Sequence, residues 1–120
     1  MINTQGSKRF DLEERTFIFA KKVREFVKIL PKIQSNFDDS DQLIRSSGSV
    51  GANYIEANES LSKKDFFMRI KICRKEAKES KYWLNLICTN NQPELERSRE
   101  ILINEAGELT KIFGSIIVKE

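Results

Sequence analysis

The chain has 120 residues, which is enough for one domain with a single hydrophobic core. Its 21 basic and 18 acidic residues give a net charge of +3, which is too small to indicate nucleic-acid binding by itself. The chain has no histidine, so the commonest general base and metal ligand is missing, and its two prolines and five glycines leave most of it free to form helices.

The charge changes sign from one segment to the next. Residues 1–37 carry eight basic and four acidic side chains (+4), whereas residues 38–61 carry one and five (−4). Residues 62–89 carry eight and three (+5), and residues 90–120 carry four and six (−2). This alternation is typical of neighbouring helices with complementary charges, and a binding surface is the alternative.

The N-terminal part is predicted to be an arm followed by a helix. Residues 1–10 are polar, and we expect a flexible arm there, with the folded domain over residues 11–120. Asp11 is a candidate N-cap for a helix that runs to Leu30, because Pro31 cannot continue it. The apolar residues of this helix recur at helical spacing: Leu12, Phe19, Val23, Phe26 and Leu30.

A second helix is predicted over residues 42–60, after a connection at residues 34–41 whose acidic residues are candidate caps. Each of its interior glycines, Gly48 and Gly51, costs about 1 kcal/mol relative to alanine. Small residues also let another backbone approach closely, so packing can outweigh this cost. The expected core stripe is Leu43, Ser47, Val50, Tyr54, Ala57 and Leu61.

The clearest helical pattern covers residues 63–89. Ser62 is its expected N-cap, with Asp65 three residues later. A heptad seam runs through it: Phe66, Ile70, Cys73, Ala77, Ser80, Leu84 and Ile87. A second apolar stripe widens this face: Met68, Ile72, Trp83 and Leu86.

A last helix is predicted from Pro93 to about Val118. Its seam is Leu95, Ser98, Leu102, Ala106, Leu109, Phe113 and Ile116. No strand-like alternation persists anywhere in the sequence. Four helices with three short connections predict an all-α fold, an antiparallel up-down-up-down four-helix bundle. The first and third helices offer more apolar surface than one bundle needs, which predicts a homo-oligomer.

The sequence offers no catalytic constellation, so we expect no enzyme and no cofactor. Cys73 and Cys88 are fifteen residues apart on one predicted helix, about 22 Å, which is too far for a disulfide. Glu56, Glu76 and Glu79 could share a metal, but carboxylate metal sites in bundles also use histidine, so pairing with Lys or Arg is favoured. The sequence shows no signal peptide and no membrane span, which favours the cytoplasm.

One surface could bind a ligand. Four lysines align on the side of residues 63–89 away from the seam, with two further basic residues alongside: Lys64, Lys71, Lys75 and Lys78, then Arg74 and Lys81. Tyr82 ends this row with an aromatic ring. Such a row could neutralise phosphates without reading base sequence. A solvated face, or one turned toward the acidic helices, is the alternative.

Three motifs resemble one known family. Residues 45–57 (RSSGSVGANYIEA), 76–84 (EAKESKYWL) and 107–113 (GELTKIF) are similar, in order, to the second-, third- and last-helix signatures of the four-helix bundle proteins encoded by intervening sequences in bacterial 23S ribosomal RNA genes. The resemblance covers about residues 10–119. It implies the same bundle, with five motif residues at helix or subunit contacts: Asn53, Glu56, Glu76, Glu79 and Trp83.

The resemblance also implies partners. Members of the family resemble the accessory variability proteins of diversity-generating retroelements, which form pentamers with basic surfaces and work with nucleic acid and a reverse transcriptase. The first functional hypothesis is therefore a non-catalytic homopentamer that binds RNA or DNA through the basic residues of the third helix. The second is a structural or protein-partner assembly module with no nucleic-acid role.

Overall fold

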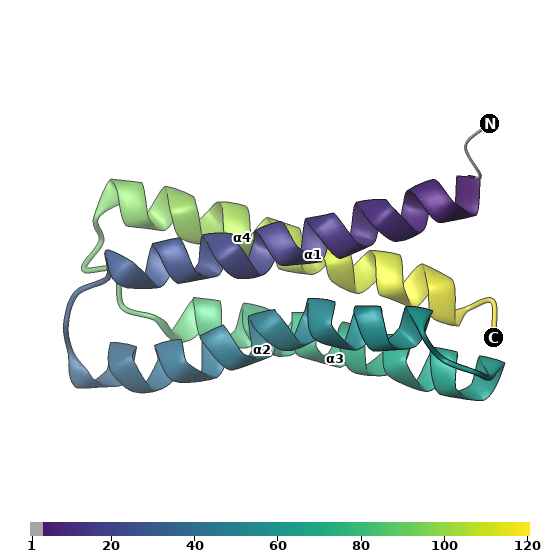
Figure 1. The fold of residues 1–120 in the computed structure, drawn as a ribbon. Coiled ribbons are helices and arrows are strands. Elements are labelled where there is room, and N and C mark those ends of the chain that lie inside the picture. Colours follow the sequence, from purple (N-terminus) through teal and green to yellow (C-terminus); the bar gives the residue numbers. More distant parts are fainter. Residues whose placement is uncertain (1–3) are drawn as a thin grey trace.

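The computed structural model describes residues 4–120, and the side chains of residues 12–120. It contains four helices: α1 (Thr4–Lys28), α2 (Gln34–Asn58), α3 (Lys63–Leu86) and α4 (Pro93–Ile117). Successive helices run in opposite directions, and α1 and α4 lie together above α2 and α3 in Figure 1. The predicted all-α four-helix bundle is confirmed.

The core lies where the four predicted seams meet. Every seam residue predicted for the first helix is buried, as are most of those predicted for the third and last helices. The α3 seam is buried at Ile70, Cys73, Ala77, Ser80 and Leu84. The predicted cap of α3 is also confirmed, because the Ser62 side chain accepts a hydrogen bond of 3.1 Å from the backbone N–H of Asp65. The described helices include none with the length and apolar character that a bilayer crossing requires.

Two helices begin earlier than expected. The first starts at Thr4 and not at Asp11, so residues 4–10 of the expected arm are helical, while residues 1–3 lie outside the described part of the chain. No proline interrupts residues 4–10, and a single glycine there does not stop a helix. The second starts at Gln34 and not at residue 42.

Two buried polar residues lie in the part of α2 that was expected to be a connection. Asn36 and Ser40 are buried and extend the stripe of Leu43 and Ser47 backwards at steps of three and four residues. The acidic residues expected as caps, such as Asp38, therefore lie within the helix, and the N-cap position is Ile33, which makes no side-chain capping bond. Three helices also end earlier than expected: α1 at Lys28 and not Leu30, α2 at Asn58 and not residue 60, and α3 at Leu86 and not Thr89. Leu61, expected in the core stripe of the second helix, is fully exposed.

Close helix packing explains the glycines of α2. A Cβ at Gly51 would lie 2.8 Å from the Thr16 hydroxyl oxygen of α1, a distance that real Cβ atoms do not tolerate. A Cβ at Gly48 would lie 3.2 Å from the Arg24 guanidinium. The glycines thus let α1 and α2 approach each other, and α2 stays helical through both positions despite their low helix propensity.

Candidate functional site

The outer face of α3 carries the predicted lysines. Lys64, Lys71, Lys75 and Lys78, here called the basic row, are all exposed. Their position follows from helix geometry, because the seam residues Ile70 and Ala77 point into the core and leave these lysines on the opposite side. Lys81 is also exposed, whereas Arg74 is half-buried. The structure therefore brings five of the six predicted basic residues to solvent on one helix.

The basic row is largely unpaired by acidic side chains. In the part of the chain whose side chains are described, Lys71 is the member of the row with an ion pair, between its Nζ and Glu120 Oε1 at 2.9 Å. The two side chains are 47% and 46% exposed, so water screens this pair and it contributes little to stability. Lys64, Lys75 and Lys78 therefore make no ion pair with any acidic side chain that the structure describes.

An aromatic ring and a thioether lie on the same outer face. Tyr82 is 58% exposed and Met68 is 49% exposed. The Tyr82 ring meets the Trp83 ring nearly edge-on, with centroids 5.0 Å apart. Trp83 is half-buried against the core, and its Nε1 donates a hydrogen bond of 3.3 Å to Glu79 Oε2. The anchored Trp83 thus supports Tyr82 on the surface.

The five family-motif residues have different surroundings. Asn53 joins two helices, because its Oδ1 accepts a hydrogen bond of 3.0 Å from Arg69 Nη1 of α3. Glu79 and Trp83 contact each other within α3. Glu56 is exposed, and Glu76 is half-buried with its backbone carbonyl accepting from Ser80. The structure therefore assigns a helix–helix contact to Asn53, whereas contacts of the other residues with another subunit remain a prediction.

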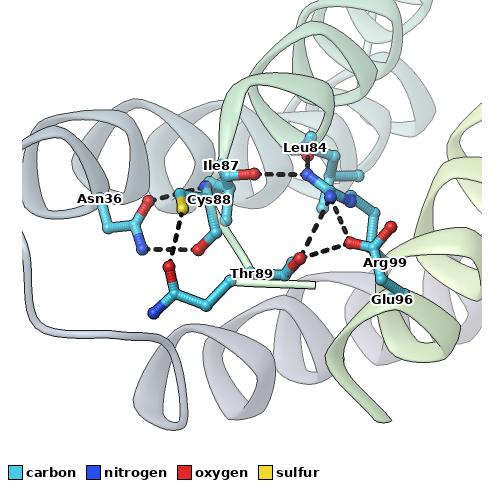
Figure 2. A network of polar contacts seen from close by, with 8 residues as sticks. Asn36, Leu84, Ile87, Cys88, Thr89, Glu96 and Arg99 are labelled. Carbon is cyan, nitrogen blue, oxygen red and sulfur yellow. Dashed lines mark hydrogen bonds and ion pairs between the residues drawn. The ribbon is translucent and has the colours of Figure 1, made fainter. Parts of the chain in front are cut away.

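A polar network that was not predicted from the sequence lies at one end of the bundle (Figure 2). Asn36 of α2 pairs with the backbone of Cys88, just after α3: Asn36 Nδ2 donates to the Cys88 carbonyl, and the Cys88 N–H donates to Asn36 Oδ1, both at 2.9 Å. Asn36 Nδ2 also donates to the Pro31 carbonyl at 3.1 Å. One buried amide thus ties the α1–α2 connection to the end of α3. Extending the α2 stripe upstream would have identified this residue.

Arg99 of α4 completes the network. Its guanidinium donates to the carbonyls of Leu84 and Ile87, which lie in the last turn of α3 and just beyond it, and also contacts Thr89 and Glu96. A helix end leaves such carbonyls without intrahelical partners, so Arg99 acts as a C-terminal cap supplied by another helix. Hydrogen bonds from Thr89 and then Arg99 lower the pKa of Glu96 below its usual value.

The two cysteines have different surroundings. Burial raises the pKa of the Cys73 thiol to about 12, so this group stays protonated at neutral pH and packs as a small apolar side chain. Both cysteines are free thiols. Cys88 is half-buried, and its Sγ lies 3.3 Å from Asn90 Oδ1. Among the described residues, no three Cys, Asp or Glu side chains gather at a spacing that would hold a metal ion.

Comparison with known proteins gives a consistent assignment. Residues 8–115 match the 23S rRNA-intervening sequence protein family. The fold is similar to the crystal structure, at 1.70 Å resolution, of a protein of unknown function from the S23 ribosomal protein family of Bacteroides thetaiotaomicron, with 34% identity and a TM-score of 0.75. The similarity covers 88% of this chain and 96% of that one. No curated protein matches. The chain belongs to the 23S rRNA-intervening sequence protein family.

Proposed function

We propose that this chain acts in the cytoplasm as a non-catalytic, oligomeric helical bundle that binds RNA or DNA without base specificity through the outer face of α3. The observation that carries the proposal is the basic row, four exposed lysines on one side of one helix that make a single, partly exposed ion pair with the side chains of residues 12–120. The helix holds the Cα atoms of these lysines in fixed positions relative to one another, and each flexible side chain carries its charge outward from the same side. Such a row suits a polyanion better than it suits a small ligand.

The chemistry of lysine determines how the outer face of α3 would bind nucleic acid. Its ammonium is a compact, strongly hydrated charge, which attracts phosphate oxygens without the forked geometry that reads a base edge. Binding would therefore depend on phosphates and tolerate any sequence. If the four lysines each neutralise one phosphate, the logarithm of the binding constant should fall with the logarithm of salt concentration with a slope of about −3 to −4.

The proposed homo-oligomer, a pentamer by family resemblance, is supported by apolar side chains that the bundle leaves uncovered. Phe17, Ile18 and Ile101, on α1 and α4, are exposed. A groove of about 430 Å³ between these helices is lined by Ile18 and Ile101 together with both acidic and basic residues. Association through such surfaces would remove apolar area from water, and a ring would repeat the basic row around its circumference.

A filter-binding assay with mixed-sequence RNA and DNA at low salt tests the binding proposal. We expect retention by the wild-type chain and at least a tenfold loss with Lys75→Glu/Lys78→Glu, because two phosphate contacts become repulsive. The matched control is Lys28→Glu/Lys32→Glu, which makes the same change of net charge at exposed positions outside the α1–α4 groove, in the last turn of α1 and in the connection after it. Equal losses in both variants, or no retention of the wild type, would contradict a specific role for α3.

Light scattering tests the assembly. A pentamer of a 14.0 kDa chain has a mass of 5 × 14.0 = 70 kDa. We expect that mass for the wild type and a smaller particle for Phe17→Asp, because a carboxylate on this surface would have to be desolvated in an interface. A wild-type mass of 14 kDa at high protein concentration would overturn the oligomer.

The groove between α1 and α4 favours the second candidate, a structural or protein-partner module with no nucleic-acid role. Its exposed apolar side chains suit a protein surface, whether another copy or a partner such as a reverse transcriptase. The Lys75→Glu/Lys78→Glu variant separates the candidates. Under this alternative the variant would assemble and hold its partner as well as the wild type does, and neither would retain nucleic acid.

A further inference from the structure

Two parallel lines of side chains occupy the outer face of α3. Lys64, Lys71 and Lys78 are seven residues apart, and since seven residues make almost two full turns, they follow one line along the helix axis. Met68, Lys75 and Tyr82 are also seven apart and follow a neighbouring line. One line is purely cationic, whereas the other places two large exposed apolar groups beside it.

The lines are long enough for an extended strand. Lys64 and Tyr82 are 18 residues apart, which corresponds to about 27 Å along the helix. The exposed Leu86 lies one turn beyond Tyr82 and extends the apolar surface to the end of α3. The face thus offers several phosphate-binding charges and, at one end, an aromatic ring with an aliphatic neighbour.

A duplex would use only half of this surface. Its bases are stacked inside, so a duplex presents no free base face to the Met68 thioether or the Tyr82 ring. A single strand presents phosphates together with the faces of its bases. Proteins that bind single strands combine a basic track with aromatic rings on which bases stack, and this stacking is tolerant of sequence.

Building on the proposed function, we infer that the outer face of α3 selects single-stranded nucleic acid, with phosphates along the lysines and a base stacked on Tyr82. The Tyr82 ring is suited to this role because more than half of it is exposed while its contact with Trp83 supports it from one side. Trp83 is itself held by packing against the core and by its hydrogen bond to Glu79.

Fluorescence anisotropy with labelled oligonucleotides of about 16 nucleotides tests the inference. The probes are a mixed-sequence single-stranded RNA, the matching single-stranded DNA, and the duplex of each. The wild-type chain should bind each single strand at least fivefold more tightly than its duplex at the same salt concentration. Comparing the two single strands shows whether the sugar contributes.

Substitution of Tyr82 tests base stacking separately from the phosphate contacts of the lysines. Tyr82→Ala should weaken single-strand binding about tenfold while leaving duplex binding and the salt slope unchanged, because every phosphate contact remains. Tyr82→Phe keeps the ring and should bind within twofold of the wild type. Phe37→Ala removes a comparably exposed aromatic ring from α2 and should also have no effect.

These experiments distinguish single-strand selectivity from nucleic-acid binding in general. Equal or tighter duplex binding, or a Tyr82→Ala variant that binds single strands normally, would overturn the single-strand selectivity while the lysine-dependent binding stands. The duplex comparison uses the wild-type chain, so it decides even if Tyr82→Ala does not fold. Failure of every probe to bind at low salt would overturn both.

Discussion

Two helix pairs of this bundle meet in contrasting ways. Between α2 and α3 small side chains face each other: Ser46 and Ser80 are fully buried and share a hydrogen bond of 2.9 Å. Between α1 and α4 an ion pair joins Arg15 to Glu105, and a groove remains open beside it. Among the helix pairs that contact each other in the described part of the chain, α2–α3 has the most extensive contact and α1–α4 has the least.

The difference in packing between α2–α3 and α1–α4 corresponds to two different proposed surfaces. Small residues bring the backbones of α2 and α3 close together, which leaves no room for adjustment and holds α3 as a rigid support for its outer lysines. The looser contact between α1 and α4 leaves apolar side chains at the surface, where another protein chain could cover them. The closely packed side thus carries the proposed ligand face, and the open side carries the proposed contacts between subunits.

The largest loss of folding stability is expected from a substitution in the contact between α2 and α3. Ser80→Leu would force a large side chain against Ser46 and remove a buried hydrogen bond, and we expect the free energy of unfolding to fall by about 3 kcal/mol. The control is Ser115→Leu, at an exposed position of α4, which should change it by less than about 0.5 kcal/mol. Urea denaturation measures both. If both variants change the unfolding free energy by similarly small amounts, the α2–α3 contact adapts to a larger side chain as easily as the contact between α1 and α4.

A smaller loss is expected at the end of the same helix pair. Asn36→Ala would leave the backbone N–H and carbonyl of Cys88 without their side-chain partner, at a cost of about 2 kcal/mol in unfolding free energy. Ser35→Ala, at the neighbouring exposed position, serves as the control. If the two variants are equally stable, the network of Figure 2 does not hold α2 against α3.

The ion pair between α1 and α4 should contribute less to folding stability. Arg15 and Glu105 form two hydrogen bonds of 2.8 and 2.9 Å, but both side chains are partly exposed. A double-mutant cycle with Arg15→Ala and Glu105→Ala should give a coupling energy of about 0.5–1 kcal/mol that declines as salt is added. A coupling energy above about 2 kcal/mol would mean that the α1–α4 contact is as well protected from water as the contact between α2 and α3.

The smallest effect should be a pH dependence at the corner between α3 and α4. The pKa of Glu96 is lowered in the folded chain, so its stabilising interactions are fully present above the unfolded pKa near 4.5. They are lost as the pH falls through the lower folded value. In urea titrations, wild type should exceed Glu96→Gln in stability at pH 6, and the difference should shrink steadily below pH 4.5. A constant difference across this range would contradict a role for the charged form.

Local patterns in the sequence were enough to predict the bundle. The seam of α3 predicted its buried residues from Ile70 to Leu84, the cap at Ser62 was identified from its spacing to Asp65, and the lysines of the basic row were predicted to face away from the core. These features depend on the 3.6-residue period and on hydrogen bonds within one turn, both of which are visible in a short stretch of chain.

Only the tertiary structure decided the features that join distant residues. The hydrogen-bond partner of Asn36 is Cys88, 52 residues away, and the glycine at position 51 is explained by Thr16 of another helix. Likewise, the ion pair of Lys71 with Glu120 and the cap that Arg99 supplies to α3 join separate elements. A periodic pattern tells which side of a helix is apolar, but the partner of each polar group is fixed only when the helices pack.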